Sequence, residues 1–574
     1  LVGQAVIRKY DQDENVTNKK IINYDWDNNE VREKRTPNSA ERRYQKTLSK
    51  NFTLYADYKK NFNDRHDLSV MVGTSHESEN YDRFTAKRIN FDQQENMSLQ
   101  LGSAQDQNAW SEGNQWTINS FFSRVNYTFA NKYVIEGTIR ADGSSRFDPD
   151  HRWGWFPGVN AAWRVGEEGF MKRLGWFEDL KVRASYGEMG NQSGIGLYDY
   201  IQLISLSNDY YPFGAGVKGQ MATSGNIIST SRTWETIQTT NVGFDFSTLN
   251  NRLYGSFDYF WKENKNMLIP KTYPSMLGAD APSTNSGHLS IHGWEISLGW
   301  RDQIKDFSYS VRFNISDAKN KVVDRVGSNL IKLGNNETPT GYPLNSYFGY
   351  EFDGIIQNEQ ELEAYKSRFS EGGIPGDLSV GDAMYKDLDG DGKLSVLGDG
   401  KEGSGDVKYL GDKNPRYNFG FNLSMAWKGF DLSAFIQGVG RRTMFLEGES
   451  RCPMPEAWYQ SAEYWYGKTW TPERTDAQYP AITLKDKRNY NYYVSTNTKF
   501  NVAYARLKNL QFGYTIPQTL TSKAGLQKVR VYFSGEDLFE VHNTPNGWDP
   551  EENSGSITSY PFTRNYSFGI NVVF

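Results

Sequence analysis

The last ten residues of the chain, NYSFGINVVF, alternate between large apolar side chains and small or polar ones. In an extended strand one face carries Tyr566, Phe568, Ile570, Val572 and Phe574, while the other carries mainly Asn, Ser and Gly. A strand with one apolar face that ends on an aromatic residue is typical of the lipid-facing wall of a β-barrel. If the pattern repeats along the chain, it predicts an all-β protein of an outer membrane.

The pattern does repeat, in about sixteen segments of about ten residues, the length that a tilted membrane strand needs. In SFFSRVNYTF, Arg124 alternates with Val125 and its apolar neighbours, and in the next segment Glu136 and Arg140 lie opposite Ile135. An Arg that faces lipid at mid-bilayer costs about 2 to 4 kcal/mol. The charged face therefore lines a wet lumen, and the segments predict a transmembrane antiparallel β-barrel.

The connections between these segments alternate in length, which predicts that long and short ones lie on opposite rims. Outer-membrane barrels have short periplasmic turns and long outer loops, whereas a soluble sandwich or propeller has no reason to separate loops in this way. The expected short turns are 61–65, 130–132, 249–252, 302–305 and 428–429, with longer ones at 166–178 and 515–525. The expected long loops are 11–49, 79–115, 189–235, 264–288, 319–414, 441–498 and 538–562.

Composition excludes several other classes of protein. No run of about 18 apolar residues is present, so a helical membrane span is not expected. The single Cys452 rules out a disulfide framework or a thiolate metal cluster. The net charge of -5 comes from interspersed charges, which argues against a nucleic-acid partner. No Ser/His/Asp, Cys/His or close carboxylate pair stands out, so we expect no enzymatic activity.

The segment DLDGDGKLS, inside the expected 319–414 loop, has the spacing of an EF-hand-like Ca²⁺ site. Three carboxylates occupy positions 1, 3 and 5, and position 12 is Gly398 rather than Glu, so Asp399, Asp406 or another group must close the site. The bound Ca²⁺ would be structural, and a solvated acidic turn is the alternative. The candidate ligands are Asp387, Asp389, Asp391, the Lys393 carbonyl, Ser395 and Asp399.

The segment EAWYQSAEYWYGKTW makes the expected 441–498 loop rich in aromatic side chains. Aromatic faces can stack on sugar rings or hold peptide side chains, but they can equally form the loop's own small core or a partner interface. We favour the second interpretation. The residues concerned are Trp458, Tyr459, Tyr464, Trp465, Tyr466 and Trp470.

Several segments, in order along the chain, resemble the C-terminal barrel of the SusC/RagA family of TonB-dependent outer-membrane transporters. The first 115 residues or so resemble the family only in general character. The matching segments include IRADGSSRFDPDHRWGWFPGVNAAWRV (139–165), LKVRASYGEMGNQ (180–192), YKDLDGDGKLS (385–395), TWTPERTDAQYP (469–480), YARLKNLQFGYTIPQTL (504–520) and GWDPE (547–551).

The resemblance implies a 22-stranded barrel filled by an N-terminal plug, and active import of oligosaccharides or oligopeptides. No plug is recognisable here, so we expect the plug and about six strands to come from residues outside this sequence, since an open sheet edge cannot face lipid. Two alternatives are a self-closed sixteen-stranded passive porin, in which the first and last strands pair, and a surface adhesin or structural barrel.

The resemblance also implies partners and roles for single residues. A SusD-like lipoprotein would cover the barrel, TonB–ExbB–ExbD would supply energy through the plug, and two transporter–lipoprotein pairs could form a dimer. The lumenal Arg124, Glu136 and Arg140 would face the plug. The aromatic end of the chain, Tyr566, Phe568 and Phe574, would be the signal for barrel assembly.

Overall fold

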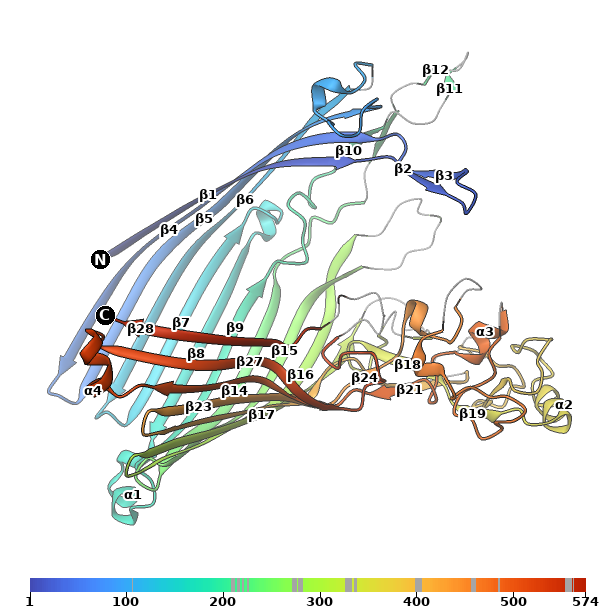
Figure 1. The fold of residues 1–574 in the computed structure, drawn as a ribbon. Helices are drawn as coiled ribbons and strands as arrows, with labels where there is room; N and C mark the ends of the chain where they lie inside the picture. The colour runs from blue at the N-terminus through green and yellow to red at the C-terminus, as the bar shows by residue number, and fades with distance from the viewer. Residues whose placement is uncertain are drawn as a thin grey trace.

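Sixteen strands form one antiparallel sheet, and their order in the sheet is their order in the sequence (Figure 1). The computed structural model describes residues 1–105, 107–207, 212–213, 217–218, 221–224, 227–270, 276, 282–325, 333–334, 338–397, 405–455, 461–483, 486–552, 560 and 562–574. The sixteen strands, in sheet order, are β1 (Val2–Asn18), β4 (Ser39–Phe62), β5 (His66–Ile89), β6 (Gln107–Phe129), β7 (Tyr133–Ser144), β8 (Trp153–Arg164), β9 (Asp179–Asn191), β14 (Glu235–Thr248), β15 (Leu253–Pro270), β16 (Ser283–Ile304), β17 (Phe307–Asp324), β22 (Arg416–Trp427), β23 (Phe430–Arg441), β26 (Tyr504–Thr515), β27 (Lys528–His542) and β28 (Asn565–Val573).

The hairpin of β6 and β7 shows how the alternating pattern sets the register. Val125 pairs with Gly137 on the outer face, and Asn126 pairs with Glu136 on the inner face. Val125 and Ile135 are 43% and 52% exposed, as expected of side chains that face lipid rather than a protein core. Ala130 and Asn131 take positive φ angles of 50° and 56°, the conformation of a tight turn that matches the twist of the two strands. The predicted faces of this hairpin are confirmed.

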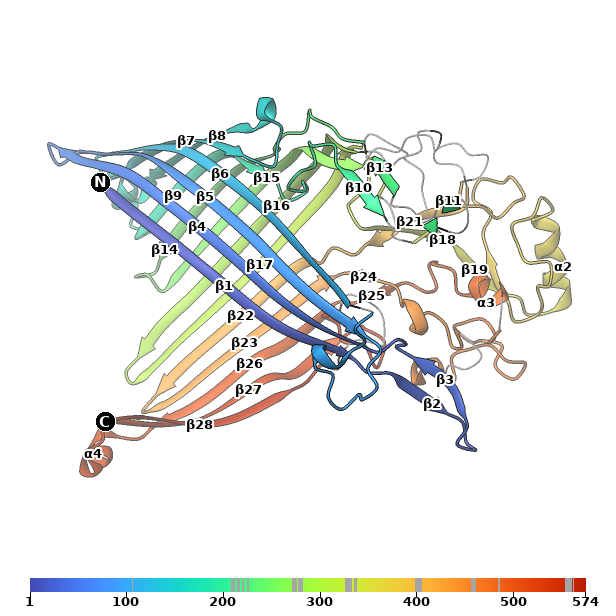
Figure 2. The same ribbon diagram turned by 90° about the horizontal axis from the view of Figure 1, so that it is seen from above.

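Short and long connections lie at opposite ends of the sheet, as predicted (Figure 1). We call the two ends the short-turn rim and the long-loop rim; both chain termini lie at the short-turn rim (Figures 1 and 2). The longer connections of the short-turn rim contain η3 (Val165–Glu167), α1 (Gly169–Leu174), α4 (Gln518–Thr521) and η7 (Ser522–Ala524).

Several strands are much longer than the expected ten residues. Both β4 and β5 have 24 residues, and β15 and β16 have 18 and 22. The expected loops 11–49, 79–115 and 264–288 are therefore wrong, because much of each belongs to strands. At about 3.3 Å per residue such a strand spans about 80 Å, far beyond an apolar band of about 25 Å even when tilted. The outward positions of β5 read Leu68, Val70 and Val72 near the turn and His76 and Ser78 beyond them. The alternation ends with the bilayer while the hydrogen-bonded ladder continues, which is why the sequence pattern missed the projecting part.

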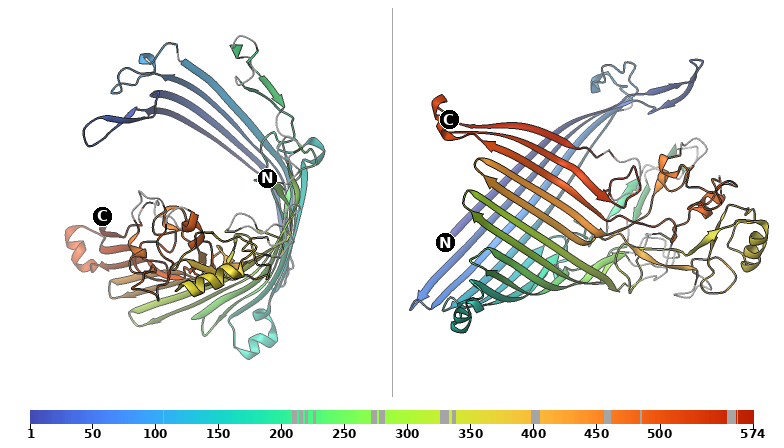
Figure 3. Two further views of the ribbon diagram at one scale, coloured as in Figure 1. Left: turned by 90° about the vertical axis from the view of Figure 1, so that its right-hand side faces the viewer. Right: turned by 60° about the horizontal axis from the view of Figure 1, so that its bottom comes forward.

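The sheet curves strongly but stays open between β1 and β28 (Figures 2 and 3). Among the described residues, β1 pairs with β4 and β28 pairs with β27, and the sheet places these two strands at its ends. The alternative of a self-closed sixteen-stranded barrel is therefore wrong for this chain. Within the described part of the chain, no helix is both long and apolar enough to span a membrane.

The long-loop rim carries small hairpins and short helices, and the larger groups of buried side chains lie among them. The hairpins pair β2 (Ile21–Tyr24) with β3 (Glu30–Lys34), β10 (Ile204–Ser207) with β13 (Met221–Ser224), β11 (Pro212–Phe213) with β12 (Val217–Lys218), β18 (Ser346–Tyr350) with β21 (Val407–Asp412), β19 (Phe352–Ile355) with β20 (Ala383–Tyr385), and β24 (Thr443–Met444) with β25 (Phe500–Asn501). The helices are η1 (Leu99–Leu101), η2 (Pro149–His151), α2 (Glu359–Arg368), η5 (Gly448–Ser450), η6 (Glu463–Trp465) and α3 (Asp486–Asn491).

Candidate functional site

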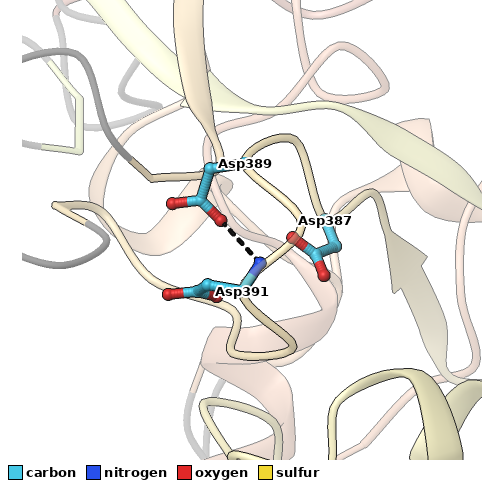
Figure 4. A group of neighbouring side chains, drawn as sticks. All are labelled: Asp387, Asp389 and Asp391. Carbon is cyan, nitrogen blue, oxygen red and sulfur yellow. Dashed lines mark hydrogen bonds between the residues drawn. The ribbon is translucent and has the colours of Figure 1, made fainter.

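The three aspartates of the acidic turn come together directly after β20 (Figure 4). One carboxylate oxygen from each of Asp387, Asp389 and Asp391 lies within 4.8 Å of the others. The Asp387 carboxylate accepts the N–H groups of Gly390 and Gly392 at 2.7 and 3.1 Å. These glycines have positive φ angles of 75° and 74°, which fold the chain tightly around the carboxylates. The backbone of the turn thus holds the three carboxylates close together.

Asp406 fixes both ends of this turn from the loop interior. Its fully buried carboxylate accepts the N–H of Leu388 at 2.6 Å and the N–H of Ser395 at 2.8 Å. Burial raises the pKa of Asp406, and the nearby charges of Asp389 and Asp387 raise it further. Carboxylate and carbonyl oxygens are the ligands that Ca²⁺ prefers.

Of the other predicted ligands, two lie on the acidic turn itself. Lys393 and Ser395 lie on the turn, where Lys393 donates its N–H to Asp391 Oδ1 at 2.8 Å. Asp399 lies outside the described residues. Lys386, next to Asp387, directs its ammonium to Glu351 at 2.7 Å and contributes to lowering the pKa of Glu351 to about 2.

The two longest loops, 325–415 and 442–503, fold together into one unit that we call the loop domain. Its main core contains residues of both loops: Tyr350, Ile356, Leu362, Tyr365, Phe369, Leu378, Ala383, Tyr385, Leu394 and Tyr490. The Tyr365 hydroxyl lies 2.7 Å from the Tyr490 hydroxyl and accepts the Tyr385 N–H at 2.9 Å. Asn491 donates to Asp382 at 2.9 Å and accepts the Ala383 N–H at 2.9 Å. The sequence analysis predicted two separate loops. Their joint core becomes visible only through contacts between residues that are more than a hundred positions apart in the chain.

The predicted aromatic residues divide between the interior and the surface of the loop domain. Trp465 is 3% exposed and packs against Tyr479 with ring centroids 4.9 Å apart, while Tyr464 contacts the rings of neighbouring aromatic residues. Trp470 donates its indole N–H to Gln357 Oε1 at 3.1 Å across the two loops. Tyr466 is 88% exposed, so its ring is open to a partner or ligand. Trp458 and Tyr459 lie outside the described residues.

The three predicted lumenal residues lie on the inner face of β6 and β7. Glu136 accepts N–H groups of Asn126 at 3.2 Å and Asn160 at 3.1 Å, and Arg140 pairs with Asp142 at 2.8 Å. Arg124 stands opposite Thr138 on the same face. Their contact with a plug remains a prediction.

Comparison with known proteins decides the family. A family model described as "TonB dependent receptor-like, beta-barrel" matches residues 8–538. The chain belongs to this family. TonB-dependent receptor P3 of Formosa agariphila is 31% identical over 558 residues, which cover 92% of this chain and 52% of that protein. TonB-dependent receptor SusC of Bacteroides thetaiotaomicron is 26% identical over 568 residues, 91% of this chain and 50% of SusC. The chain thus spans about half the length of these curated relatives.

Solved structures agree on the fold of this TonB-dependent receptor barrel. A structure of the RagAB peptide transporter superposes with a TM-score of 0.80 and 22% identity, over 99% of this chain and 59% of that one. The predicted SusC/RagA-type relationship and outer-membrane location are confirmed. The relatives named above are TonB-dependent receptors.

Membership in the family orients the receptor barrel. By the general rule for outer-membrane barrels, short turns face the periplasm and long loops face outward. The extracellular position of the acidic turn and the loop domain follows from that rule and remains a prediction. Phe574, directly after β28, lies at the short-turn rim and is 82% exposed. Tyr566 and Phe568 lie near the start of β28, opposite Gly535 and Phe533 of β27, and are 62% and 83% exposed on the lipid-facing side. Their role as an assembly signal remains a prediction.

Proposed function

We propose that the chain is the barrel portion of a TonB-dependent transporter that imports oligomeric nutrients, glycans or peptides, across the outer membrane. Family membership supports this proposal most directly. The polar inner face of the sheet and the folded extracellular loop domain fit a barrel that recognises a solute outside and passes it inward. The protein makes and breaks no bond; it binds, gates and releases.

The open sheet supports a longer barrel. Because lipid cannot satisfy the free backbone groups of a strand edge, β1 and β28 need partners. We propose that about six further strands and a plug, both outside this chain, complete a 22-stranded barrel on which TonB–ExbB–ExbD acts. Arg124, Glu136 and Arg140 would then contact the plug.

The loop domain would be the docking surface for a SusD-like surface lipoprotein. It is compact, extracellular and stabilised by its own core, so it can present a defined surface, on which Tyr466 is an exposed aromatic anchor. Affinity purification of the full-length protein should recover a lipoprotein encoded nearby, and light scattering should show whether two such pairs form a dimer. Purification of the transporter alone at native expression level would contradict the docking proposal.

Growth of a deletion strain tests the transport proposal. We expect the strain to lose growth on one class of oligosaccharide or oligopeptide while still growing on the corresponding monomers, with recovery when the gene is restored. A porin or an adhesin predicts unchanged growth on every oligomer in the panel, and that result would contradict import.

We further propose that the acidic turn binds one structural Ca²⁺, with Asp387, Asp389 and Asp391 as carboxylate ligands and the Lys393 carbonyl and Ser395 completing the set. The converging oxygens support this proposal. Titration calorimetry of the purified protein should show a Ca²⁺ site of weak to moderate affinity that is lost in Asp389→Ala/Asp391→Ala. Asp377→Asn, which removes an exposed charge from the same loop, is the matched control. Equal Ca²⁺ binding by all three proteins would contradict the site.

A further inference from the structure

The connection between β8 and β9, residues 165–178, carries unusually exposed apolar side chains. On and just after α1, Phe170, Leu174 and Trp176 are 47%, 50% and 66% exposed. Lys172 and Arg173 lie between them in sequence and are also exposed. This composition, large apolar groups together with basic ones on a short surface helix, is typical of segments that lie in a membrane interface.

Contacts at its first end hold this connection to the lipid-facing side of the wall. Glu168 accepts the hydroxyl of Tyr133 at 2.7 Å and the indole N–H of Trp163 at 3.1 Å. These two aromatic residues pair on the outer face of β7 and β8, with stacked rings 6.3 Å apart. The helix α1 therefore starts next to outward-facing aromatic residues rather than over the lumen.

Contacts at the other end of the connection also hold it to the lipid-facing side of the wall. Phe177 packs edge-on against Phe246, 6.3 Å between ring centroids, and Phe246 belongs to the apolar outer face of β14. The carbonyl of Trp176 accepts the hydroxyl of Thr248, which lies on the same face. The turquoise helix accordingly lies outside the curve of the sheet (Figure 3, left) and beyond its short-turn rim (Figure 1).

Two other turns of the short-turn rim differ in chemistry. The turn between β4 and β5 is Asn63, Asp64 and Arg65, and the turn between β22 and β23 is Lys428 and Gly429. These turns reverse the chain in a few polar residues. The 165–178 connection is longer, and its exposed apolar surface is continuous with the lipid-facing wall.

We propose that residues 165–178 form an interfacial anchor in the periplasmic leaflet of the outer membrane. Phe170, Leu174 and Trp176 insert among the lipid chains near the headgroups, where aromatic rings are favoured. Lys172 and Arg173 lie at the level of the phosphates and attract anionic phospholipids. The pair of Lys172 with Glu167, at 2.7 Å, joins an exposed ammonium to a half-buried carboxylate at the protein surface. A surface pair of this kind is weak enough to be exchanged for a phosphate. The anchor fixes the height of the barrel in the bilayer at this point of the wall, and it does not depend on the transported solute.

Depth-dependent quenching tests this proposal. In full-length protein with Cys452→Ala, Leu174→Cys is labelled with a nitrobenzoxadiazole dye and reconstituted in vesicles of phosphatidylcholine and phosphatidylglycerol. Asp64→Cys supplies the matched control on a polar turn of the same rim, and Trp176→Cys is a second probe in case Leu174→Cys does not fold. We expect lipids with a spin label near the headgroup to quench the dye at 174 several-fold more than at 64, and aqueous iodide to quench it less.

Two results of the quenching experiment would contradict the anchor. Iodide quenching at 174 and 176 equal to that at 64 would overturn the anchor. Shielding from both iodide and lipid quenchers would also overturn it, because it would show a protein partner on this surface. Replacing phosphatidylglycerol by phosphatidylcholine should reduce lipid quenching at 174, and Lys172→Gln/Arg173→Gln should remove that difference. A lipid dependence unchanged in this double variant would overturn the assignment of the two basic residues.

Discussion

At the scale of single residues, Asp406 is the side chain that makes the acidic turn a defined structure. It is buried beneath three exposed or half-exposed carboxylates and binds the backbone at both ends of the turn. A buried carboxylate near like charges is costly unless a cation or a proton compensates it. Asp406 therefore couples the proposed Ca²⁺ site to proton binding.

This coupling predicts the pH dependence of Ca²⁺ binding. Burial, assisted by Asp389 and Asp387, raises the pKa of Asp406 above its ordinary value of about 3.9. A raised carboxyl pKa means that the metal-free turn takes up a proton more readily than an unfolded chain, and Ca²⁺ must displace that proton. We expect Ca²⁺ affinity to fall as the pH is lowered into the acidic range in which Asp406 takes up its proton. Calorimetry in buffers of different ionisation enthalpy should detect proton release in that range, and affinity independent of pH would contradict the coupling.

Tyr365 makes a second prediction at this scale. Its hydroxyl accepts the buried N–H of Tyr385, so Tyr365→Phe leaves that N–H without its partner, at a cost of about 1 to 3 kcal/mol. The loop domain should be cleaved faster in limited proteolysis and unfold at lower temperature. Tyr466→Phe, a change to an exposed ring, should leave both unchanged. Equal protease resistance of the two variants would show that the joint core does not depend on this bond.

At the scale of strands, every strand of the sheet has a part that spans the membrane. Several strands also have a part that projects beyond it on the long-loop side. The apolar outward band is about as long as the bilayer requires, and β4 and β5 continue past it as polar strands. The projecting ladders bring the loops well above the membrane surface. They also explain why loop boundaries in this part of the chain were harder to predict than the strands themselves.

The inner and outer faces of a strand should respond oppositely to the same substitution. Val125→Arg places a charge on the lipid-facing side of β6 and should destabilise the folded barrel by up to about 2 to 4 kcal/mol, the midplane value. Asn126→Arg, one residue further, places the same charge in the lumen beside Glu136 and should have little effect. Denaturant titration in vesicles gives the difference, and equal destabilisation by both variants would contradict the assigned faces.

At the scale of the whole molecule, the sequence predicted the wall better than the loops. The alternation of apolar and polar residues predicted that Val125 and Asn126 lie on opposite faces. This prediction is possible because one face of each strand contacts lipid and the other contacts water, so successive residues must differ in polarity. The joint core depends on pairs such as Asp382 and Asn491, 109 residues apart, which no local pattern marks. The acidic turn was visible because its ligands are close in sequence. The exposed Phe170, Leu174 and Trp176 were overlooked because a short irregular turn has no period to detect.

Energy-dependent uptake is the most direct test of TonB-dependent import by this barrel. The oligomer identified by the growth panel would be supplied in radiolabelled form to cells with and without TonB, and to cells whose proton gradient has been collapsed. We expect saturable uptake that is lost without TonB and without the gradient, and lost equally on deletion of this gene. Uptake that proceeds unchanged without TonB, in proportion to concentration, would contradict it and would show that the barrel is a passive pore.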